Sequence, residues 1–131
     1  MLTHFERFMG GPRLTARDRV HVTLNHKSEI NLNRRAYELL GEPSAVFLAY
    51  DRKNALIAVE PARERLREAF PVYAKSGTWV IHASPFCRHI GVRLDRVMKF
   101  EDPAIQPDHS LHLNLKTMTQ AGWKIYKQKR K

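Results

Sequence analysis

The sequence has one cysteine, no long apolar run and few glycines, and these shortages exclude several classes of protein. The single cysteine, Cys87, excludes an internal disulfide. No apolar stretch approaches the roughly eighteen residues that a membrane-spanning helix needs, so we expect no membrane partner. The first nineteen residues lack the apolar segment of a secretory signal. Together these absences predict a cytoplasmic protein.

Motifs of the common enzyme classes are also missing. There is no Walker loop, no GxSxG motif and no dinucleotide-binding fingerprint. The seven histidines come without a CxxC or HExxH spacing, although His82, Cys87 and His89 lie within eight residues. We interpret Cys87 as a core thiol and the histidines as scattered polar residues. The sequence therefore predicts a non-enzymatic protein without metal or cofactor.

Positive charge is what the sequence has in excess. Its 23 Lys+Arg oppose 13 Asp+Glu, which gives a formal net charge of +10. Such a surplus favours association with DNA or RNA, although many small soluble proteins are basic without binding either. The net charge is +3 over residues 1–70 and +7 over residues 71–131, and the last sixteen residues hold six bases and no acid.

The stretch from Val20 to Glu60 has a regular plan of apolar and polar residues. Alternation with period two predicts strands, and Asn33 is expected to cap a short helix that stops at Gly41. The expected elements are a strand over 20–24, a turn over 25–28, a strand over 30–32, a helix over 34–40, and a hairpin of strands 45–50 and 55–59.

The same plan is expected again from residue 72. Ser84 is expected to cap the second helix, with Pro85 at its first position and Gly91 at its end. Setting Ile30 on Ile81 aligns strand, cap, helix and glycine of the two halves. The expected elements are a hairpin of 72–74 and 78–82, a helix up to residue 90, and a second hairpin of strands 96–100 and 111–115. This predicts two pseudo-repeated strand-turn-strand-helix-hairpin halves.

These elements predict one domain with two appendages. A basic arm over 1–19 is expected to dock through Phe5, Phe8 and Met9. A barrel-like domain over 20–115 follows, with halves 20–60 and 72–115. The connector 61–71 is expected to form one or two helical turns, and residues 116–131 form a basic tail.

The strand-turn-strand-helix unit resembles the swapped-hairpin AbrB family, which includes transition-state regulators, MazE-type antitoxins and MraZ. The matching residues are Val22 to Ile30, Leu32-Asn33 and Ala36 to Gly41. The turn at 25–28 lacks the family's usual glycine and arginine, and Asn33 stands where a proline is usual. The resemblance implies a mainly β fold with short helices, in which two interleaved hairpin units build a barrel. It also implies a homodimer or a monomeric pseudo-dimer.

For function, the resemblance implies a DNA-binding transcriptional regulator that uses the strand-turn region and nearby arginines. The corresponding residues are His26, Lys27, Arg34 and Arg35. A second basic set accompanies Trp123 and Tyr126 in the tail: Lys116, Lys124, Lys127, Lys129, Arg130 and Lys131. The competing interpretation is that these bases are simply solvated. The alternative functions are an RNA- or ribosome-associated factor and an antitoxin-like protein-interaction module.

Overall fold

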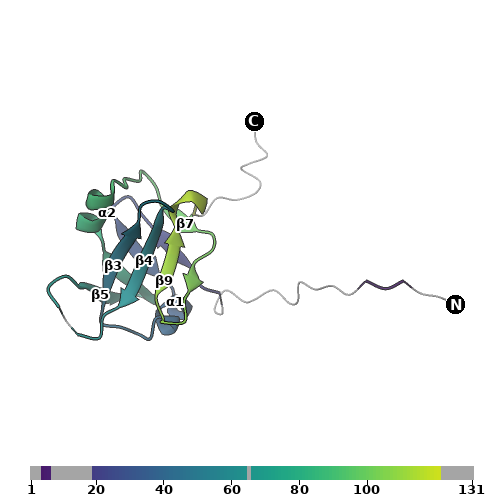
Figure 1. Cartoon of the computed structure of the whole chain (residues 1–131), viewed down its shortest axis with the longest axis horizontal. Helices are drawn as coiled ribbons and strands as arrows, with labels where there is room; N and C mark the ends of the chain where they lie inside the picture. The colour runs from purple at the N-terminus through teal and green to yellow at the C-terminus, as the bar shows by residue number, and fades with distance from the viewer. Residues whose placement is uncertain (1–3, 7–18, 65, 122–131) are drawn as a thin grey trace.

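The computed structural model describes residues 4–6, 19–64 and 66–121 (Figure 1). Within these ranges ten strands form one antiparallel sheet in the order β10-β7-β1-β2-β6-β5-β3-β4-β9-β8. The strands are β1 Val22–Leu24, β2 Glu29–Leu32, β3 Ala45–Asp51, β4 Leu56–Pro61, β5 Phe70–Lys75, β6 Thr78–His82, β7 Met98–Phe100, β8 Ala104–Ile105, β9 Leu111–Asn114 and β10 Met118–Gln120. The helices are α1 Arg34–Leu39, α2 Ser84–Ile90 and the 3-10 turn η1 Leu115–Thr117. None of the helices in these ranges has the length and apolar character needed to cross a membrane.

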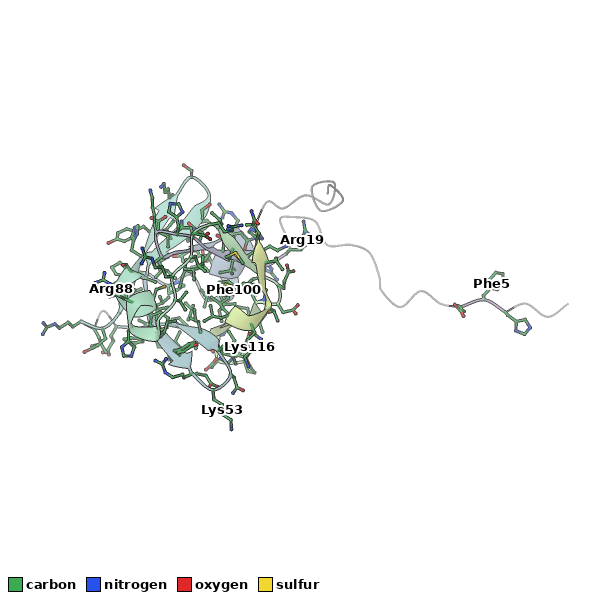
Figure 2. All side chains as sticks on the ribbon, turned by 90° about the horizontal axis from the view of Figure 1, so that it is seen from above. Phe5, Arg19, Lys53, Arg88, Phe100 and Lys116 are labelled. Atoms are coloured by element: carbon green, nitrogen blue, oxygen red, sulfur yellow. The ribbon has the colours of Figure 1, made fainter. Side chains whose placement is uncertain are left out.

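The sheet curls so that one face encloses the core. Figure 1 shows β3, β4 and β9 side by side as one wall, and their fully buried residues include Val46, Ile57 and Leu111. The opposite wall contributes Ile30 and Ile81, among others, to the same apolar cluster. Phe100, the largest fully buried side chain, lies inside the body of the barrel in Figure 2. The expected mainly β fold with short helices is confirmed.

The predicted elements of the first half are all present. Asn33 is the N-cap of α1, and its Oδ1 accepts a hydrogen bond from the Ala36 amide at 2.9 Å. Just after this helix Gly41 takes a φ of +90°, a left-handed conformation that side chains disfavour. The hairpin β3–β4 pairs Val46 with Pro61 and Asp51 with Leu56. Local pattern and capping chemistry were therefore sufficient for this half.

The start of the second helix differs from the prediction. The residue at the N-cap is Ala83, and Ser84 is already the first helical residue and makes no capping hydrogen bond. The reason is that the Ala83 carbonyl already accepts the first helical bond from the Cys87 amide at 2.8 Å. Pro85 then occupies the second position, where no intrahelical donor is required either. The helix stop at Gly91 is confirmed, with a φ of +82°.

The second hairpin was predicted wrongly. Residues 111–114 pair with β4 and β8, and β7 pairs with β1 and β10 instead. Leu111 and Leu113 are fully buried beside β4, so burial of these leucines decides the pairing. The sheet also continues to Gln120, which brings part of the segment expected as tail into it.

Two further predictions fail in the described residues. The described residues of the connector 61–71, which are all of them except residue 65, form no helix. Its charged residues are exposed there and present no apolar stripe that packing could stabilise. Phe5 is 91% exposed, so it does not dock on the core. Phe8 and Met9 lie outside the described residues.

In the antiparallel pair β2–β6, which we call the central pair, Ile30 lies directly opposite Ile81, and the sheet continues with three strands on one side and five on the other. On one side of this pair β1 is followed by β7, and on the other side β5 is followed by β3. Strands that precede the connector therefore pair with strands that follow it at four places: β2–β6, β1–β7, β3–β5 and β4–β9.

Candidate nucleic-acid interface

The turn between β1 and β2 is built by Asn25 and presents two bases. The Asn25 Oδ1 accepts hydrogen bonds from the amides of Lys27 at 2.9 Å and Glu29 at 3.0 Å. Its Nδ2 donates to the Glu29 carboxylate at 2.8 Å. This hydrogen bond is the largest cause of a pKa of Glu29 below its usual value. His26 and Lys27 are exposed at the tip of the turn. An asparagine thus organises a turn that lacks glycine.

Helix α2 packs against this turn. The Ala83 amide donates to the Ser28 carbonyl at 2.9 Å, which joins the turn to the residue that begins the helix. Between them lies a hollow of about 470 Å³, which we call the α2 hollow. It is lined by His26, Ser28, Ser84, Cys87, Arg88, Gly91, Val92 and Arg93. One of the predicted site residues, His26, thereby comes together with two arginines, Arg88 and Arg93, that were not predicted.

The predicted arginines Arg34 and Arg35 begin helix α1 and already have partners within the chain. The Arg34 guanidinium lies over the Trp79 ring, 5.4 Å from its centroid. That ring stacks on Tyr37 with centroids 4.7 Å apart. Arg35 Nη1 is 3.8 Å from Glu38 Oε1, and both side chains are exposed. Such exposed contacts stabilise weakly, so both arginines stay accessible to an anion.

Within the predicted set, the structure separates the turn bases His26 and Lys27 from the helix arginines Arg34 and Arg35. The turn at 25–28 precedes β2 and α1 follows it, so the four residues of β2 separate them by about 13 Å. Because β6 runs antiparallel to β2, the β5–β6 turn lies at the α1 end of the pair and α2 at the other. Arg34 and Arg35 lie at one end, in α1, while Arg88 and Arg93 lie with His26 at the other, beside Lys27 of the turn. Two basic groups therefore occupy opposite ends of the central strand pair.

Most of the net charge lies elsewhere. The described residues contain 14 Lys+Arg and 12 Asp+Glu, which gives a net charge of +2. The other residues contain 9 Lys+Arg and 1 Asp+Glu, which gives a net charge of +8. The predicted bases Lys124, Lys127, Lys129, Arg130 and Lys131 lie outside the described residues. Lys116 lies in η1. The described barrel is therefore only weakly basic as a whole, and any anion site on it depends on local grouping.

The histidines and the cysteine do not form a metal centre in the described part of the chain. No group of three or more His, Cys, Asp or Glu side chains there is placed to hold a metal ion. His82 Nδ1 is 3.3 Å from Glu29 Oε2, and His109 Nδ1 is 3.2 Å from the Leu39 carbonyl oxygen. Cys87 is buried, and burial raises the pKa of its thiol. These groups have local structural partners.

A second concave region lies where the chain enters the barrel. Asn33 Nδ2 donates to the Arg19 carbonyl at 2.7 Å, and its Oδ1 accepts from the His21 amide at 3.1 Å. Here burial lowers the pKa of His21, and the nearby positive charges of Lys99 and Arg19 lower it further. Lys99 Nζ is also 3.8 Å from Glu101 Oε1. Asn33 thus connects the entering chain to α1 as well as capping the helix.

Sequence reasoning missed Arg88 and Arg93 for a specific reason. The available signal was two arginines flanking the helix stop at Gly91. Their importance depends on the contact between α2 and the β1–β2 turn, which are more than fifty residues apart in the chain. No local pattern predicts that contact.

Comparison of the chain with protein-family models, with curated proteins and with solved structures finds no match in any of the three.

Proposed function

We propose that the chain is a non-enzymatic DNA-binding protein of the swapped-hairpin, AbrB-like type, in which two pseudo-repeated halves build the barrel within one chain. The strand order supports the repeat. Outward from β2 the sheet continues with β1, β7 and β10, and outward from β6 it continues with β5, β3 and β4. Each N-terminal hairpin of a half is thus flanked by a later strand of the other half, as interleaved hairpins require.

The register at the centre also supports the repeat. If the two halves are superposed with Ile30 on Ile81, Glu29 falls on Val80 and Asn31 falls on His82. The Glu29–His82 pair then corresponds to the Asn31–Val80 pair, and the sheet contains both pairs. Strand β9 departs from the scheme, because it extends the sheet beyond β4 without a counterpart beyond β10. The symmetric part of the proposal therefore covers the eight strands from β10 to β4.

The observation that carries the DNA-binding proposal is the placement of positive charge. Basic groups flank both ends of the central pair β2–β6, and five further bases follow Ala121 without an acid among them. Phosphate contacts of this kind dominate affinity for duplex DNA and make it sensitive to salt. The duplex would lie along the β2–β6 pair, with the tail as an additional contact.

An electrophoretic mobility-shift assay with duplex DNA at about 50 and 200 mM salt tests the proposal. We expect binding at micromolar protein that weakens steeply at the higher salt. Absence of salt-sensitive binding would contradict it. Competition with RNA of equal length separates the proposal from an RNA- or ribosome-associated factor. A DNA-binding regulator should stay bound to the labelled DNA duplex in the presence of the RNA, whereas an RNA-binding factor should release it.

A matched pair of turn variants localises the contact. Lys27 and Lys53 are both exposed lysines at hairpin tips, in the β1–β2 and β3–β4 turns respectively. Lys27→Glu is expected to weaken DNA binding several-fold more than Lys53→Glu, although the two changes alter the net charge equally. Equal effects would show that general charge, and not this face, governs binding.

The low net charge of the described barrel favours an antitoxin-like protein-interaction module as the second candidate. Such a module would tolerate charge reversal across Lys124 to Lys131. If the reversal abolishes the biological activity of the protein, that result argues against the protein-interaction module.

A further inference from the structure

We infer that the α2 hollow is a phosphate-binding subsite, and that the phosphate belongs to the backbone of the bound DNA. The assignment to DNA rests on the proposed function, whereas the affinity for phosphate rests on the hollow itself.

The lining of the α2 hollow is basic and hydroxylic. Its lining residues include Arg88, Arg93, His26, Ser28 and Ser84. No carboxylate lines it. Among the described residues the ion pairs involve Arg35, Arg96, Lys99 and His82, and none involves a base of this hollow. The charges of Arg88 and Arg93 are therefore not neutralised within the described chain.

Three other hollows of the described ranges differ on this point. The hollow at Arg19 and Lys99 includes Glu101, and the hollow at Arg96 includes Asp95. The hollow at Arg63 includes Glu60 and Asp108. Of these four hollows only the α2 hollow combines several bases with no acid, which is the composition that an anion requires.

One exposed hydrogen bond orients Arg88 at the α2 hollow. Arg88 Nη2 is 3.3 Å from Ser84 Oγ, which holds the guanidinium along the helix. Gly91 ends the helix with a left-handed turn, and Arg93 follows it onto the same hollow. Arginine forks bind the oxygens of a phosphate through two parallel hydrogen bonds, and serine hydroxyls can donate further ones. Because burial raises the pKa of the Cys87 thiol, this residue stays neutral and does not repel an anion.

The surroundings of the hollow favour a polymer over an isolated phosphate. Arg93 also lines the neighbouring hollow of about 520 Å³, which continues past Met98 to Gln120. Beside it the Ala121 amide donates to the Val97 carbonyl at 3.0 Å, and the five tail bases follow from there in the sequence. A backbone bound at Arg88 would continue along Arg93, where the second hollow also includes Asp95, a carboxylate that is paired with Arg96. Figure 2 shows Arg88 at the surface of the barrel.

A double variant, Arg88→Gln with Arg93→Gln, tests the inference in the full chain. The control is Arg63→Gln with Arg67→Gln, which removes the same charge from the connector. We expect the first variant to lose about tenfold or more in DNA affinity and its log–log salt slope to become shallower by about 1.8. The control is expected to change both quantities much less. Unchanged unfolding midpoints in urea show that both variants fold.

The outcomes separate the subsite from the proposed function. If the wild type binds DNA and both variants lose affinity equally, the subsite is wrong while the proposed function stands. If the wild type binds no DNA, the proposed function fails. Titration with inorganic phosphate, followed by amide NMR, then tests whether the α2 hollow binds phosphate. Saturable shifts at Ser28, Ser84 and Arg93 then support a site for a small phosphorylated ligand, and their absence overturns the subsite.

Discussion

The described barrel and the rest of the chain differ in what they contribute. The described residues, almost all of them in the barrel, hold the buried apolar cluster and carry a net charge of +2, while the other residues carry a net charge of +8. Apolar burial and hydrogen bonding specify the fold, and neither requires a net charge. The comparison indicates that stability and affinity for a polyanion are separately encoded. Changes in the two regions should therefore have separable effects.

The largest effect is expected from the tail. Replacing Lys124, Lys127, Lys129, Arg130 and Lys131 together by glutamine removes five positive charges. If each contacts a phosphate, affinity for duplex DNA falls at least about a hundredfold near 0.1 M salt, and the log–log salt slope becomes shallower by about 4.5. Mobility shifts over a salt series measure both quantities. A variant with undiminished affinity would assign binding to the barrel alone and remove the distinction between the regions.

The next effect concerns the barrel, where Asn33→Ala is expected to lower the free energy of unfolding. The substitution removes the cap on Ala36, the acceptor of the His21 amide and the donor to the Arg19 carbonyl. Loss of a cap and of two further hydrogen bonds costs about 2–3 kcal/mol. Urea unfolding measures the loss, while the salt slope of DNA binding is expected to stay unchanged.

Asn31→Ala is the matched control for this change. The Asn31 side chain makes one long hydrogen bond, to the Glu29 carbonyl at 3.4 Å. We expect a loss below about 1 kcal/mol. A cost equal to that of Asn33→Ala would show that the capping network adds nothing.

The two halves of the barrel differ in how far the sequence predicted them. In the first half Asn33 and Gly41 are local signals at the helix ends, and alternation or a short apolar run marks each strand, so the elements could be predicted. In the second half Leu111 and Leu113 alternate as expected but pair with β4, because their partner is decided by burial far along the chain. Periodicity predicts that a strand exists and does not predict its neighbour.

The candidate site shows the same limit. His26 and Lys27 could be predicted from a polar turn and a family resemblance. Arg88 and Arg93 could not, because their grouping with His26 arises from the packing of α2 on the β1–β2 turn. The sequence predicts which bases exist, whereas tertiary packing determines which of them lie without a neighbouring acid.

A smaller effect is expected where the backbone is left-handed. Gly91→Ala would place a Cβ at a φ of +82°, with no other atom within 4 Å, so the cost is conformational and about 1 kcal/mol. Ala55, with a φ of +55° in the β3–β4 turn, offers the reverse change. Ala55→Gly is expected to be neutral or to stabilise slightly, because it relieves the same strain. Urea unfolding of both variants checks the opposite trends, and a stabilising Gly91→Ala would contradict this account.

The smallest effect is expected at the junction of the two regions, in the pH dependence of stability. Burial, with Lys99 and Arg19 nearby, lowers the pKa of His21 below its usual value. As the pH falls through about 6.5, the unfolded chain takes up this proton before the folded protein does. The free energy of unfolding therefore decreases from neutral pH toward the lowered pKa. His21→Gln should lose less stability between pH 7.5 and 5.5 than the wild type, as measured by urea unfolding.

Arg19 sharpens the comparison, because it is the described residue at which the N-terminal segment meets the barrel. Arg19→Gln removes one of the charges that disfavour protonation of His21, so the variant should lose less stability over the same pH interval. Burial is the larger cause, so most of the contribution of His21 to the pH dependence should persist in this variant and be absent only in His21→Gln. If Arg19→Gln abolished it entirely, the charge of the entering segment, and not the packing of the barrel, would control His21. The two regions would then be electrostatically coupled at their junction.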